Sequence, residues 1–276
     1  MSQPMSEPAK DAAPAAEAPA KSEAAPVAAA AATKFRLRPI PIFMVVLLGL
    51  GIPVLASLLI DFAGDHMRLP AVHTSRLSFL YYHHGVQLVL SLIAIAIARR
   101  VVPANYGLQW PRGNGYIVPA IYWGLAFGLI MTLVDYGPNL LAHTAPKFDD
   151  PLTRPNVIGW LFFQGAYSGP TEEVLYRALL VTYLAATMPG KVHFRGFEMN
   201  GAGVVVAVIF ALAHMGSFIT EFWLVALGQQ VYAFALGVLY AYWFEKSKSI
   251  VAPIVGHNLS NLTEYILLFA MIATWR

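Results

Sequence analysis

Long apolar stretches recur along the chain at nearly regular intervals, separated by short polar segments. A helix needs roughly 20 consecutive apolar residues to cross a bilayer. Stretches of this kind occupy residues 40–60, 77–98, 115–135, 157–187, 201–220, 222–244 and 250–274. The pattern predicts an all-α protein, a polytopic transmembrane bundle of about seven helices. The stretch 157–187 contains Gly169-Pro170, so we expect either one kinked helix or two shorter pieces there.

Composition supports an integral membrane protein. The 276 residues are 58% hydrophobic and 12% charged, whereas soluble domains carry about 25% charged residues. The absence of cysteine excludes disulfides, thiolate nucleophiles and cysteine metal sites. The net charge of +3 is small and most basic residues lie in loops. We therefore expect the lipid bilayer as a partner and no nucleic acid.

Residues 1–33 differ from the rest of the chain, because they are rich in alanine and proline and contain no aromatic residue. Such a segment has little to bury, so we expect a disordered tail. Its character favours a bacterial protein, which would place the chain in the inner (cell) membrane. Residues 34–114 are expected to form N-terminal transmembrane helices.

Lysine and arginine placement predicts the orientation, since basic residues gather on the cytoplasmic side. With a cytoplasmic N-terminus, ten basic residues fall inside and five outside. The inside set is Lys34, Arg36, Arg38, Arg99, Arg100, Arg112, Lys191, Arg195, Lys246 and Lys248. The outside set is Arg68, Arg76, Lys147, Arg154 and Arg276. The N-terminus is therefore expected in the cytoplasm.

Three charges interrupt the apolar stretch 157–187, in the sequence TEEVLYR. On a helix, Glu173 and Arg177 lie about 40° apart around the axis, close enough for an ion pair. Glu172 points about 100° away from Glu173 and can face a different wall. It is then free to act as a general base. The alternative is that all three residues form an ion-pair cluster that braces the bundle.

Two later stretches carry further polar residues. In FALAH, Phe210 lies one turn before His214 on the same helix face and can pack beside its imidazole. In GHNLSN, His257 and Asn261 are four apart, so both project from one face and could donate to one oxyanion. Each residue could instead be a hydrogen-bonded bundle residue. The adjacent His83 and His84 are either interior packing or contacts of the site.

Together these stretches resemble a known family. EEVLYR at 172–177 fits EExxxR, FALAH at 210–214 fits FxxxH, and HNLSN at 257–261 fits HxxxN. In this order the motifs are similar to those of the CAAX-protease and bacteriocin-processing (CPBP, or ABI) intramembrane endopeptidases, which include the type II CAAX prenyl proteases. The resemblance covers about 115–270 and implies a protease core at 115–276, with a polar cavity that opens towards the cytoplasm.

The resemblance also implies roles for single residues. Glu172 and His214 would activate the attacking water, and His257 and Asn261 would stabilise the oxyanion. Glu173 and Arg177 would hold the motif helix in place, beside Phe210.

The sequence leaves two possibilities for a cofactor, a zinc ion or no metal. Glu172, His214 and His257 could form a catalytic zinc set of one glutamate and two histidines. The family also resembles a metal-free protease in which glutamate and histidine polarise water directly. The chain has no HExxH motif, so no local pattern decides between zinc and no metal.

Three functions are compatible with the pattern. The first is an intramembrane endopeptidase that acts on membrane-associated proteins or peptides. The second is a non-catalytic membrane scaffold or a bacteriocin-immunity-type protein that keeps the motifs for structure. The third is a carrier that uses the buried carboxylates, although no internal repeat supports it.

Overall fold

The computed structural model describes residues 35–67, 71–113, 115–194 and 196–275. The tail expected at residues 1–33 lies outside the described residues.

Helices dominate the described chain. The long ones before the motif region are α1 (Pro39–His66), α3 (Arg76–Val101) and α4 (Ile117–Ala142), with the short α2 (Ala71–Thr74) between α1 and α3. A continuous helical run follows, made of α5 (Arg154–Phe162), the π-helix η1 (Phe163–Tyr167), α6 (Ser168–Glu173), the π-helix η2 (Val174–Val181) and α7 (Thr182–Thr187). The last helices are α8 (Gly201–Leu212), α9 (Ser217–Thr220), α10 (Trp223–Ser247) and α11 (Val251–Trp275).

The all-α membrane architecture is confirmed, since helix covers most of every predicted apolar stretch. Within the described residues, five helical segments are long and apolar enough to cross a membrane: 39–66, 76–101, 117–142, 201–220 and 223–247. The run 154–187 and α11 are not among the five. Both carry the polar motif residues.

A two-stranded antiparallel hairpin, which the apolar pattern did not predict, links α7 to α8. It consists of β1 (Lys191–Phe194) and β2 (Phe197–Asn200), with Lys191 opposite Asn200. On its exposed face, hydrogen bonds from Lys191 and His193 hold the pKa of Glu198 below its usual value.

The helical run 154–187 passes Pro170 without a break, which decides between the two expected forms. Proline removes one backbone donor, and the neighbouring Gly169 N–H bonds outside the run, to Asn258 Oδ1 at 2.9 Å. A side chain at Gly169 would place its Cβ 2.3 Å from that oxygen, so Asn258 would have to move and this hydrogen bond would be lost. The two π-helical turns flank this point, and such turns occur frequently at functional sites.

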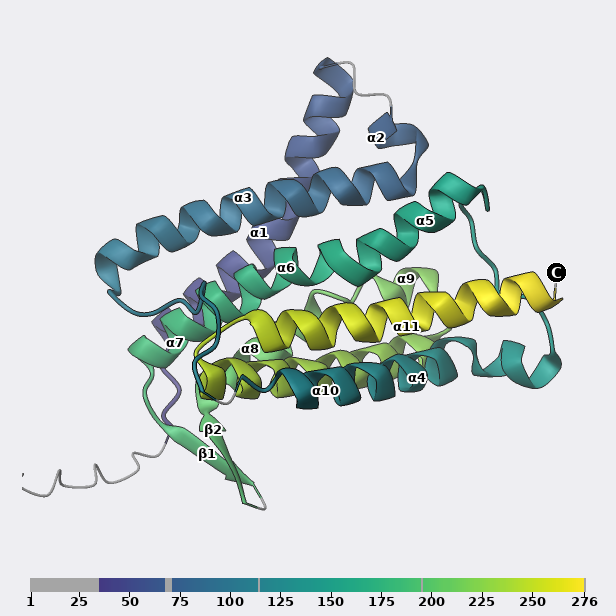
Figure 1. The fold of residues 1–276 in the computed structure, drawn as a ribbon. Coiled ribbons are helices and arrows are strands. Elements are labelled where there is room, and N and C mark those ends of the chain that lie inside the picture. The colour runs from purple at the N-terminus through teal and green to yellow at the C-terminus, as the bar shows by residue number, and fades with distance from the viewer. Residues whose placement is uncertain (1–34, 68–70, 114, 195, 276) are drawn as a thin grey trace, which may run out of the picture. The chain divides into compact units, whose positions relative to one another are not determined.

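The helical run lies at the centre of the packing. All eight residues of η2 are buried, and η2 contacts α1, α3, α8 and α10. Figure 1 shows α6 between α3 on one side and α11 on the other. Protein surrounds η2, which explains why this part of the run is apolar nearly all round and can still hold the charge of Arg177.

Small residues let α11 pack closely along α4. A Cβ added at Gly128 would lie 2.5 Å from Thr263 Cβ and 2.7 Å from the Ser260 carbonyl oxygen. At Gly124 it would lie 2.8 Å from the Gly256 carbonyl oxygen. This spacing of small residues is typical of membrane helix pairs. It sets the position of α11, which carries His257 and Asn261.

We expect Gly128→Ala to lower the free energy of unfolding by about 1–3 kcal/mol, because α4 and α11 must separate to admit the methyl group. Gly137→Ala on the same helix is the matched control, since nothing lies within 4 Å of its added Cβ. Denaturation of both variants in detergent measures the difference. Equal stability of the two would contradict the close α4–α11 packing.

Candidate active site

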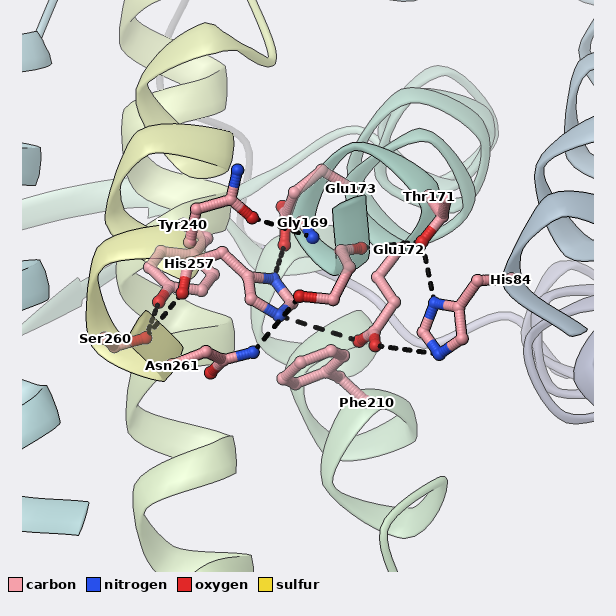
Figure 2. A network of polar contacts seen from close by, with 12 residues as sticks. His84, Gly169, Thr171, Glu172, Glu173, Phe210, Tyr240, His257, Ser260 and Asn261 are labelled. Atoms are coloured by element: carbon pink, nitrogen blue, oxygen red, sulfur yellow. Dashed lines mark hydrogen bonds and ion pairs between the residues drawn. The ribbon is translucent and has the colours of Figure 1, made fainter. Parts of the chain in front are cut away.

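One oxygen of Glu173 is the centre of a buried network. Glu173 and Arg177 are 0% exposed, and Glu173 Oε1 accepts from Arg177 Nη1 at 2.9 Å. The same oxygen accepts from His257 Nδ1 at 2.8 Å, as Figure 2 shows. Arg177 Nη2 donates to the Gly237 carbonyl oxygen at 3.3 Å. The structure thus brings together the Glu173–Arg177 pair expected from their spacing, and it joins that pair to α10 and α11.

Aromatic rings surround the arginine. Its guanidinium lies 4.6 Å from the centroid of Phe210 and 5.1 Å from that of Tyr240, which is within range for cation–π attraction. Tyr240 stacks on His257. Phe210 meets His214 edge-on at 4.9 Å, so it packs beside that imidazole as expected and also covers the ion pair.

Glu172 faces different surroundings from Glu173. Its Oε2 lies 4.0 Å from His257 Nε2 and its Oε1 lies 4.0 Å from His84 Nε2. Its side chain is 16% exposed, whereas that of Glu173 is 0% exposed. In Figure 2 the Glu172 carboxylate lies between the two imidazoles. Glu172 therefore remains available for chemistry.

His214 does not lie within a helix. His214 lies in the candidate span 201–220, but the expectation that it shares a helix with Phe210 is wrong, because α8 ends at Leu212 and His214 belongs to the exposed turn that follows. The apolar sequence continues past Leu212, so its pattern gives no sign of this end. His214 Nδ1 bonds the Phe210 carbonyl oxygen at 2.7 Å. That bond leaves Nε2 of the ring for other contacts.

His257 and Asn261 lie on one face of α11, but their polar atoms already have partners. His257 Nδ1 donates to Glu173, so Nε2 is the ring nitrogen left for the cavity, and it donates there when the ring carries two protons. Asn261 Nδ2 donates to Gln164 Oε1 at 3.1 Å and to Ser168 Oγ at 3.3 Å. Sequence reasoning missed Gln164, although a buried glutamine inside the apolar stretch FFQGAY was a signal.

Glu172, His257, Phe210 and His214 line one cavity of about 730 Å³. This volume lies in the range of ligand pockets. Exposed residues also line it, including Lys147 and Glu221. They belong to the loop after α4 and the segment before α10.

These exposed residues bear on the orientation. With a cytoplasmic N-terminus, the loop after α4 and the segment before α10 lie on the non-cytoplasmic side. The cavity then opens away from the cytoplasm. The expected cytoplasmic N-terminus and the cytoplasm-facing cavity implied by the resemblance therefore exclude each other.

The candidate zinc ligands do not form a metal centre in this arrangement. Among the residues that the structure describes, no three His, Cys, Asp or Glu side chains are grouped so as to hold a metal ion. Glu172, His214 and His257 share a cavity without meeting as a ligand set.

Comparison with known proteins gives one family. Residues 154–263 match the family model described as type II CAAX prenyl endopeptidase Rce1-like. A Streptomyces thioluteus protein described as demethylluteothin O-methyltransferase is 32% identical over 111 residues, which is 38% of this chain and 44% of that protein. The match thus spans less than half of that relative. No solved structure matches the chain.

We expect Arg177→Ala to destabilise the protein by about 3–5 kcal/mol, because Glu173 would keep a buried charge without its cation. Arg154→Ala, which removes an exposed arginine at the start of the same helical run, should change stability by about 0.5 kcal/mol or less. Thermal and denaturant unfolding in detergent measure both. An Arg177→Ala variant as stable as wild type would contradict the ion-pair network.

Proposed function

Because residues 154–263 belong to the Rce1-like family of type II CAAX endopeptidases, we propose that the protein is an intramembrane endopeptidase. It hydrolyses peptide bonds of membrane-associated proteins or peptides, and residues 115–276 form its catalytic core. The observation that carries this proposal is the position of Glu172. Its carboxylate lines the cavity between two imidazoles, while Arg177 pairs with the neighbouring Glu173.

Glu172 acts as the general base. It accepts a proton from a water molecule as the water oxygen bonds to the carbonyl carbon of the substrate. It returns that proton to the leaving amine nitrogen as the carbon–nitrogen bond breaks. His214, whose Nδ1 is held by the Phe210 carbonyl, uses Nε2 to orient the water from the other side of the cavity.

The oxyanion is stabilised from α11. Asn261 can give up its longer bond, the 3.3 Å contact to Ser168 Oγ, and donate that hydrogen to the oxyanion while it keeps its bond to Gln164. His257 lies one turn earlier on the same face. Glu173 fixes the direction of its ring, so that Nε2 faces the reacting groups.

The protein spans a membrane, and we place it in a bacterial inner membrane with its N-terminus in the cytoplasm. The excess of basic residues on that side supports the orientation. Substrates then enter from the non-cytoplasmic side. Bacteria ordinarily lack prenylated CAAX proteins, so the substrate is another membrane-associated peptide. The match covers 44% of the Streptomyces protein. The activity in its description is therefore a statement about that protein and not about this chain.

The second candidate is a non-catalytic scaffold or immunity-type protein. It needs the Glu173–Arg177 brace but makes no use of Glu172, which stands next to a large cavity. The two functions therefore differ in what a change of Glu172 alone does.

We expect Glu172→Gln to lower the rate of peptide cleavage by about 10²–10⁴-fold, because the amide cannot accept the proton. Purified protein in liposomes is incubated with a library of membrane-anchored peptides, with and without a zinc chelator. Glu198→Gln in the exposed hairpin is the matched control and should retain wild-type cleavage. We expect cleavage to persist with the chelator.

Cleavage by wild type and by Glu172→Gln alike would remove Glu172 from the chemistry. No cleavage of any peptide, with an unaltered cellular phenotype for Glu172→Gln, would favour the scaffold. Loss of cleavage with the chelator, restored by zinc, would show a metal-dependent enzyme.

The orientation can be tested because the chain has no cysteine. We expect Asp149→Cys to react with a membrane-impermeant maleimide in intact cells, since it lies beside the cavity on the outer side. Glu198→Cys should react only after the cells are permeabilised. The reverse pattern would mean that the cavity faces the cytoplasm and the N-terminus lies outside.

A further inference from the structure

His84 brings α3, which lies outside the matched segment 154–263, into the proposed site. The residue is 8% exposed. Its Nδ1 lies 2.8 Å from Thr171 Oγ1 and its Nε2 lies 4.0 Å from Glu172 Oε1. Figure 2 shows the imidazole beside these two consecutive residues of α6, with one ring nitrogen towards each.

The hydrogen bonds of Thr171 determine which nitrogen of His84 carries the proton. The threonine hydroxyl has one hydrogen, and it donates that hydrogen to a backbone carbonyl, that of Ser168 at 2.7 Å. Towards His84, Thr171 can therefore only accept. The proton of the neutral imidazole is on Nδ1, and its Nε2 lone pair faces Glu172.

Glu172 thus meets the same kind of atom on both sides. On the other side His257 donates through Nδ1 to Glu173 and also turns Nε2 towards Glu172. Two acceptors 4.0 Å apart attract each other only through a hydrogen donor between them, so we infer such a donor here, either a second proton on the imidazole or a water that donates to both. In both cases the imidazole orients the carboxylate.

Other contacts hold α3 against the helical run at this level. The Tyr81 hydroxyl donates to the Gly159 carbonyl oxygen at 2.8 Å, and Gln87 Nε2 donates to the Thr171 carbonyl oxygen at 3.4 Å. A Cβ on Gly85, the residue after His84, would lie 2.9 Å from the Tyr167 hydroxyl oxygen. The close approach of the two helices leaves His84 little freedom to turn away from Glu172.

We propose that His84 is a positioning residue for Glu172. Thr171 fixes its ring, and Nε2 holds the Glu172 carboxylate in the orientation that the reaction needs. This inference rests on the proposed endopeptidase function and adds to it a residue from a helix that carries none of the three motifs.

Two amide variants separate the two ends of the ring. His84→Gln places an amide near the position of Nε2, where it can contact Glu172. His84→Asn places its amide near Nδ1, so it keeps the Thr171 contact but cannot reach Glu172. We expect His84→Asn to lower kcat by roughly 10- to 100-fold with KM little changed, and His84→Gln to retain most of the rate.

His83 offers the matched control. Its Nδ1 contacts Ser57 Oγ at 3.1 Å, on α1 and not on α6. His83→Asn and His83→Gln should leave kcat near that of wild type. A His84→Asn variant with wild-type kcat would overturn the proposal. Wild-type kcat in His84→Asn together with a low kcat in His84→Gln would also overturn the proposal, because His84 would then act only through its contact with Thr171.

A second measurement does not depend on cleavage. In a thermal-unfolding cycle of His84→Asn, Glu172→Ala and the double variant, the double variant should lose less stability than the sum of the single losses. If the two losses are coupled but the wild-type protein cleaves no peptide, the proposed function would be contradicted, while the contact between His84 and Glu172 would be supported. Additive losses with normal wild-type cleavage would contradict the role of His84 and leave the function standing.

Discussion

The buried carboxylate of Glu173 is the constraint on which the rest of the site depends. A charge removed from water needs a partner of opposite charge and good hydrogen bonds. Glu173 obtains them from Arg177 on its own helical run and from His257 on α11. Arg177 in turn needs the Gly237 carbonyl and the ring of Phe210. The network therefore fixes α8, α10 and α11 around one helical run.

The two adjacent glutamates have different surroundings because one step along a helix turns the side chain by about 100°. Glu173 points into the packed interior, and its hydrogen bonds serve the structure. Glu172 points to the cavity and to two imidazoles. A single residue of offset thus separates the fully buried, paired carboxylate from the one that lines the cavity. The imidazole of His257 links them, since one of its nitrogens faces each glutamate.

Burial of the helical run also reconciles charge with a membrane. Lipid cannot satisfy polar side chains, so intramembrane charges face protein or a water-filled cavity. The run 154–187 has α3 and α11 on its sides, and the large cavity borders Glu172. The contact with α3 extends the site beyond the family-matched segment. It places a side chain of a helix without any motif beside Glu172.

The sequence by itself determined the helical segments, the pairing of Glu173 with Arg177 and the resemblance to the type II CAAX endopeptidases, because these follow from local spacing and from the order of the motifs. Spacing along one helix fixes which side chains share a face, whatever surrounds that helix. Only the tertiary structure decided that His84 meets Thr171 across 87 residues, that Asn261 donates to Gln164, and that one cavity joins Glu172 to the loop after α4. Such contacts arise from the close packing of separate helices, and no local period encodes which helices will lie together. The end of α8 before His214 belongs to the same group, since an apolar sequence continues past that point while the backbone turns.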